Sequence, residues 1–189
     1  MTDRVPTRAE VPASDTWDLS RLFASDADWE TAFADWQGMA DGYAKFKGTM
    51  AQGPQALLAV LEFDLQVERL GDRVGTYAFL RNSEDVANPT YQGMKARYYG
   101  AAARVAEAGS WFRPELLAVP DDTMKAFLAA PELAPHRLTL ERLLRFKPHT
   151  LGEKEERLLA LQAEIAQTPR GVFDQLTDAD LKFGTIELE

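Results

Sequence analysis

The sequence predicts an all-α protein, a multi-helix bundle of long antiparallel and shorter helices with a possible lone C-terminal strand. Three observations support this class. Apolar residues recur at steps of three and four over long stretches, which is the spacing of amphipathic helices. Capping residues and prolines stand where these stretches begin. At 46% hydrophobic and 10% aromatic over 189 residues, the chain is able to bury a core.

The N-terminal third contains an arm, a turn and a first helix. Residues 1–15 are polar, contain Pro6 and Pro12, and are expected to form an extended arm. Residues 16–23 fit a single helical turn. Ser25 fits the N-cap of a helix that should end near Gly48, because apolar residues then recur at helical spacing: Trp29, Phe33, Trp36, Ala40 and Tyr43.

Two long helices are expected next. Pro54 suits the first turn of a helix that reaches about Asn82. Asn88 followed by Pro89 predicts the N-cap and first residue of another helix, which Pro114 should end. Residues 100–103, Gly-Ala-Ala-Ala, form a thin patch on this helix where a neighbouring helix is expected to approach closely.

Shorter elements complete the expected organisation. Helices are predicted at about residues 121–130, 135–146, 150–167 and 172–176. Residues 182–189 alternate in polarity and include β-branched side chains, so they indicate a strand or a frayed tail truncated from a larger protein. A single strand without a partner is unstable in water, so a strand at this position would need a partner strand from the rest of a larger protein. The expected divisions are therefore an arm at 1–15, a helical domain at 16–181 and this tail.

Charge and composition exclude several classes of partner. The net charge of −9, from 30 acidic and 21 basic residues, disfavours nucleic acid and anionic membranes. No apolar stretch approaches the ~20 residues that span a bilayer, and the N-terminus lacks the apolar run of a signal peptide. The chain has no cysteine, so it offers no disulfide or thiolate. A cytoplasmic location is expected.

The stretch around His149 has the strongest local pattern for chemistry. Thr150 and Glu153 match a capping box at the start of a helix, and the following glutamates suit the positive end of its dipole. His149 then precedes the helix and shares no face with Glu153. His136 lies four residues after Glu132, which is not the Glu-x-x-His spacing of di-metal bundles. Both histidines are therefore interpreted as ordinary residues.

No catalytic or metal-binding residue is predicted. Neither histidine is followed by glutamate, so a His-Glu-x-x-His zinc motif is absent, and no serine lies within Gly-x-Ser-x-Gly. Asp26 and Asp28 imitate the start of an EF-hand, but the glycine and final glutamate of that loop are missing. Residues 136–147 carry a formal charge of +3, which indicates a solvated face or a partner for a carboxylate. Substrate-binding residues are unknown.

Read together, several stretches resemble the N-terminal part of oligoendopeptidase F, in the thimet-type zinc oligopeptidase family. Their order and spacing over nearly the whole chain carry the resemblance. The stretches are Arg8-Ala-Glu10, Thr16-Trp17-Asp18-Leu19, Leu22-Phe23, Phe46-Lys-Gly48, Leu57, Leu61, Tyr77-Ala78, Asp85, Asn88-Pro89, Tyr91-Gln92, Pro114-Glu115-Leu116-Leu117, His149-Thr150-Leu151, Glu155-Glu156, Leu158-Leu159-Ala160, Phe173, Leu176, Ala179-Asp180-Leu181, Phe183 and Ile186.

The resemblance implies a non-catalytic N-terminal domain that forms one wall of the substrate cleft of an enzyme hydrolysing short peptides. It places the zinc and its His-Glu-x-x-His ligands in a catalytic part absent from this chain, so the chain alone is expected to be inactive and to hold no cofactor. The implied partners are the C-terminal catalytic part of the same polypeptide and short peptides, together with self-association of the fragment. The alternative is a freestanding helical protein-interaction module without catalysis.

Overall fold

The structure is a computed structural model that describes residues 8–150, 169, 172–173, 176 and 181. Every regular element in these residues is helical, which confirms the predicted all-α class. The predicted strand at 182–189 and most of the helices predicted after residue 150 lie outside them. The chain divides into two compact units, Met1–Glu141 and Arg142–Glu189.

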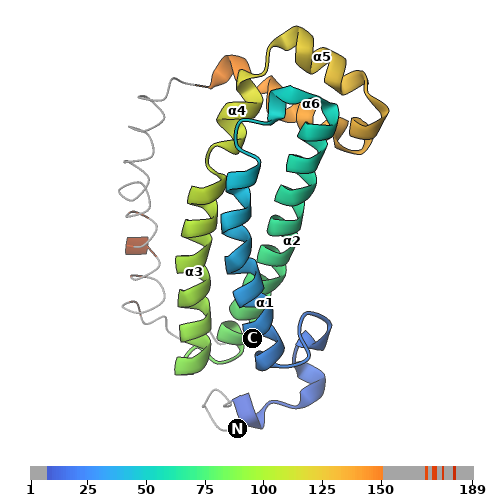
Figure 1. Cartoon of the computed structure of the whole chain (residues 1–189). Coiled ribbons are helices and arrows are strands. Elements are labelled where there is room, and N and C mark those ends of the chain that lie inside the picture. The colour runs from blue at the N-terminus through green and yellow to red at the C-terminus, as the bar shows by residue number, and fades with distance from the viewer. Residues whose placement is uncertain (1–7, 151–168, 170–171, 174–175, 177–180, 182–189) are drawn as a thin grey trace. The chain divides into compact units, whose positions relative to one another are not determined.

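Three helices of the first unit form its core: α1 (Asp26–Met39), α2 (Pro54–Glu84) and α3 (Pro89–Gly109). They lie side by side in Figure 1. Their starts agree with the predictions. The Ser25 side chain accepts the backbone N–H of Asp28, the Asn88 side chain accepts that of Thr90, and Pro54 is the first residue of α2. Each start is set by local chemistry.

Two helix ends differ from the predictions. The first helix ends at Met39 rather than near Gly48, and the chain continues as a 3-10 helix over Ala40–Lys45. This tighter helix also places apolar residues three apart, so the sequence pattern does not mark the change. Pro114 does not end α3, which stops at Gly109. It lies in the first turn of α4 (Phe112–Ala118), where a missing N–H costs no helical hydrogen bond.

The core of the bundle is built from aromatic and small side chains. Trp29, Phe33 and Trp36 of α1 are buried against Val67, Val74 and Tyr77 of α2 and Met94, Ala101 and Val105 of α3. The indole N–H of Trp29 donates to the carbonyl of Val74 at 2.9 Å, and that of Trp36 donates to the carbonyl of Val67 at 3.1 Å. Both indoles therefore satisfy their polar atom on the backbone of α2.

Two glycines of α2 make this close packing possible. A Cβ at Gly71 would lie 2.7 Å from Nε1 of Trp36, and one at Gly75 would lie 2.5 Å from Cζ of Tyr98. Ala101 of the predicted thin patch is buried as expected, but Gly100 is exposed with no atom within 4 Å of an added Cβ. The prediction was wrong for Gly100, because the closest approach is to the backbone of α2.

The remaining helices are short. They are α5 (Asp121–Ala129), a 3-10 helix over Pro131–His136 and α6 (Arg137–Arg145), which begins two residues later than predicted. The turn before α2 is held to α4 by Glu115, whose carboxylate accepts the backbone N–H groups of Gly48 and Met50 at 2.7 and 3.0 Å. Further 3-10 turns cover Arg8–Glu10, Ala13–Asp15, Leu19–Arg21, Met50–Gln52 and Lys147–His149.

Candidate functional site

The two histidines lie in separate turns. His149 ends the 3-10 helix Lys147–His149, is exposed, and donates its backbone N–H to the carbonyl of Phe146 at 2.9 Å. His136 ends another 3-10 helix, and nearby Glu132 accepts a hydrogen bond from Gln55 at 2.5 Å. Glu153, and with it the predicted capping box, lies outside the described residues.

The donors available in the described part of the chain do not fit a zinc ion. No group of three or more His, Asp or Glu side chains is gathered there in a way that could hold a metal. Asp26, the first acid of the apparent EF-hand start, accepts hydrogen bonds from Tyr77 and Arg81 instead, at 2.7 and 3.1 Å. Nor is any described helix of sufficient length and apolarity to cross a membrane.

One concave feature of the first unit is a groove between α2 and α3, called here the α2–α3 groove. It has a volume of about 410 Å³ and includes Trp36, Val67, Gly71 and Val105 in its lining. The rings of Trp36 and Tyr98 are stacked there, with centroids 5.3 Å apart and planes 16° apart. Gly71 and Gly75 permit this arrangement, since they let both rings lie against α2.

One wall of the α2–α3 groove is acidic. Asp64, Glu68 and Asp72 follow each other at intervals of four residues on α2, so their side chains share a helix face. These three residues are called the acidic stripe. Asp64 accepts a hydrogen bond from the hydroxyl of Tyr43 at 2.6 Å. The opposite wall consists mainly of small residues of α3: Ala102, Ala106 and Gly109.

Burial and neighbouring acids perturb the ionisation of one member of the acidic stripe, Glu68. Partial burial, followed by the charges of Asp64 and Asp72, raises the pKa of Glu68. Burial and the hydrogen bond to Asp64 also raise the pKa of Tyr43, so its hydroxyl keeps its proton and donates at neutral pH. A cation on the stripe would relieve the repulsion among the carboxylates, because opposite charge favours their ionised form.

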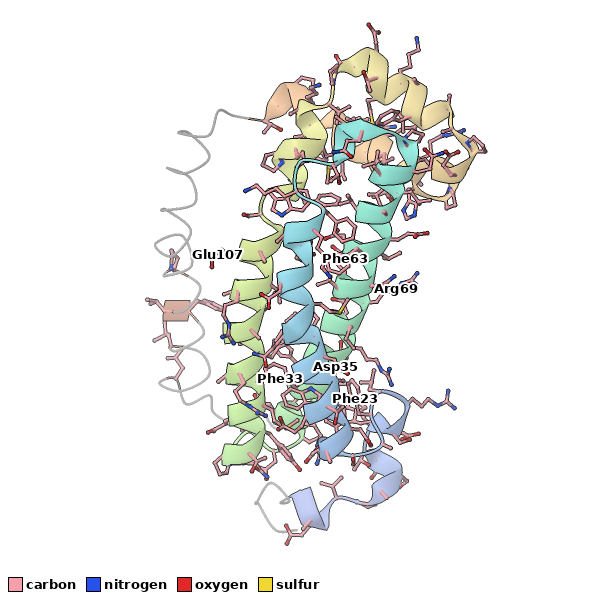
Figure 2. All side chains as sticks on the ribbon, viewed as in Figure 1. Phe23, Phe33, Asp35, Phe63, Arg69 and Glu107 are labelled. Atoms are coloured by element: carbon pink, nitrogen blue, oxygen red, sulfur yellow. The ribbon has the colours of Figure 1, made fainter. Side chains whose placement is uncertain are left out.

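Basic residues of α2 lie outside the α2–α3 groove. Arg73 donates to the carbonyl of Leu22, and Figure 2 shows Arg69 directed away from α3. Arg113 of α4 also lines the groove. The lining therefore contains three carboxylates and one guanidinium, so a ligand with positive charge suits it best.

Sequence reasoning missed the acidic stripe. It followed the apolar residues of this helix and left the spacing of Asp64, Glu68 and Asp72 unexamined, although acids four apart on a predicted helix indicate one charged face. The other parts of the site had no local signal. The stacking of Trp36 on Tyr98 joins residues that are far apart in sequence.

Comparisons with known proteins point to one class, the bacterial oligopeptidases. A family model described as Oligopeptidase F matches residues 115–183. Oligopeptidase PepF of Bacillus subtilis is 34% identical over 99% of this chain and 28% of its own length. Group B oligopeptidase PepB of Streptococcus agalactiae is 30% identical over 95% of this chain and 30% of its own length.

Solved structures agree with this class. Oligoendopeptidase-F from Enterococcus faecium superposes with a TM-score of 0.68 and 33% identity over 86% of this chain and 32% of its own. A peptidase structure from Chlamydophila abortus gives 0.73 and 25% identity over 96% of this chain and 31% of its own. The chain is thus similar, over nearly its whole length, to the N-terminal region of oligoendopeptidase F. The resemblance predicted from the sequence is confirmed.

Proposed function

We propose that this chain is the non-catalytic N-terminal domain of a zinc-dependent oligoendopeptidase and forms one wall of the cleft that receives short peptides. One observation carries the proposal. The similarity covers 99% of this chain but only 28% of the Bacillus subtilis oligopeptidase. The remaining length of such a relative is ample for a separate catalytic part.

The donor chemistry of the described residues is in keeping with this division of roles. No described group of side chains fits a zinc ion, so the metal of the proposed enzyme would be held by the catalytic part. The proposed partners are that part and short peptides. A cytoplasmic location, self-association of the separate chain and the domain boundaries at residues 15 and 181 stay predictions.

The reading frame beyond Glu189 tests the proposal. We expect it to continue in frame and to encode His-Glu-x-x-His, in a polypeptide that cleaves a quenched short peptide and loses that activity to a chelator. The 189-residue chain alone should bind no stoichiometric zinc and cleave no peptide. A stop codon directly after Glu189 would contradict the proposal and favour the freestanding interaction module.

A further inference from the structure

The lining of the α2–α3 groove is net acidic, with three carboxylates against the guanidinium of Arg113. The ion pairs seen among the described residues, Arg81–Asp26, Arg81–Glu84 and Arg97–Glu30, do not involve the acidic stripe. Three neighbouring carboxylates in a concave site therefore attract a cationic ligand.

The spacing of the acidic stripe specifies what kind of cation fits. Successive carboxylates are four residues apart, which corresponds to about 6 Å along an α-helix. An extended peptide places every second side chain on the same side, about 6.6–6.8 Å apart. Over three positions the two repeats differ by only ~1.5 Å, which the long side chains of lysine and arginine absorb easily.

The rest of the groove suits an extended backbone. The small residues Ala102, Ala106 and Gly109 of α3 leave room beside the acidic stripe. The stacked rings of Trp36 and Tyr98 also lie in the lining and give the groove an apolar part. A single terminal amine would neutralise one carboxylate only, whereas basic side chains at alternate positions reach all three.

We propose that the α2–α3 groove binds an extended basic peptide segment with lysine or arginine at every second position, its side chains on the acidic stripe and its backbone along α3. The inference rests on the proposed function, because short peptides are the ligands that it assigns to this domain. It adds the chemical class of peptide and the residues that select it.

Fluorescence anisotropy with the whole 189-residue chain tests this inference. The probe is a labelled, acetylated peptide Gly-Lys-Gly-Lys-Gly-Lys-amide at low salt. The groove variant is Glu68→Gln with Asp72→Asn. The matched control is Glu62→Gln with Asp35→Asn, two exposed residues outside the groove. Both double variants change the net charge from −9 to −7, by removing two negative charges.

We expect the groove variant to bind the probe about tenfold more weakly than the unmodified chain, and the control about twofold more weakly or less. Equal weakening in the two variants overturns the inference, because general attraction between a basic peptide and an acidic protein then explains the binding. A probe with the same three lysines in succession should bind several-fold more weakly. Equal affinity for the two probes overturns the alternate spacing.

Sedimentation of the same variants tests the alternative that a second copy of this chain occupies the α2–α3 groove. If the groove variant dissociates a self-associated chain that the control leaves intact, a second copy fills the groove, and the peptide inference is overturned. None of these outcomes depends on a zinc motif beyond Glu189, so the groove and the proposed function fail separately. Far-ultraviolet circular dichroism confirms that each variant is folded before its affinity is compared.

Discussion

Two regions of the three-helix bundle differ in how their acidic side chains are partnered. At one end, called here the paired end, Asp26 accepts hydrogen bonds from Tyr77 and Arg81, and Arg97 pairs with Glu30 above the rings of Trp29 and Phe33. In the α2–α3 groove, the three carboxylates of the acidic stripe share the lining with one guanidinium, that of Arg113. The comparison indicates that paired charges hold the helices together, whereas the acidic stripe is the part that we propose for recognition.

The pKa values follow the same division. At Asp26, burial opposes ionisation, but the hydrogen bonds from Tyr77 and Arg81 outweigh it and lower the pKa. At Glu68, burial and two neighbouring acids act in the same direction and raise the pKa. Ionisation of Asp26 therefore stabilises the fold, whereas ionisation of Glu68 destabilises it.

The largest expected effect concerns Trp36, which belongs both to the buried core and to the lining of the groove. Trp36 is 4% exposed and bonds to the backbone of α2, so Trp36→Ala should lower the free energy of unfolding by about 3–5 kcal/mol. Trp17 is 56% exposed, and Trp17→Ala should change it by less than about 0.5 kcal/mol. Urea unfolding followed by circular dichroism measures both. Similar losses would show that Trp36 is not part of a packed core.

Close packing on α2 gives the second effect. Gly75→Ala brings a Cβ against the ring of Tyr98, and such overpacking should cost about 1–3 kcal/mol before the better helix propensity of alanine offsets part of it. Gly100→Ala has open space and should stabilise α3 by about 0.5–1 kcal/mol. Opposite shifts of the urea midpoint are expected. A stabilising Gly75→Ala would refute the close contact.

Neutralising the paired end gives the third effect. Asp26→Asn should cost about 1 kcal/mol at pH 6, since it removes charge-assisted hydrogen bonds at a half-exposed site. The folded pKa of Asp26 lies below its model-peptide value of 3.8, so its ionisation contributes fully above that pH. The contribution is lost as the pH falls through the folded pKa. The difference from the unmodified chain should therefore shrink below about pH 4. A pH-independent difference would point to packing instead.

The smallest effect has the opposite sign. Because the folded pKa of Glu68 is raised, its ionised form costs stability above that pKa, and the cost disappears as the pH falls to the unfolded value of 4.5. Glu68→Gln should therefore stabilise the chain by a few tenths of a kcal/mol at pH 7, below about 0.5. Precise urea midpoints at pH 7 and pH 4 check this. A loss at pH 7 would mean that Glu68 has a stabilising partner.

Local signals predicted the helices better than the site. Ser25, Pro54 and Asn88 mark helix starts correctly, because a cap depends on a few neighbouring residues. Helix ends were harder to predict from the sequence, because the 3-10 helix at Ala40–Lys45 continues the apolar spacing of α1. The groove depends on tertiary packing. The sequence shows acids four apart, but not that Arg69 and Arg73 are directed elsewhere.

The most direct test of the account is the shift in the urea midpoint produced by a saturating amount of the alternating lysine peptide, since a ligand of the native state stabilises it. The account predicts equal shifts for the unmodified chain and for Asp26→Asn, although the latter is less stable, and almost no shift for Glu68→Gln with Asp72→Asn. An equal shift in all three proteins would contradict the claim that the acidic stripe is a recognition surface.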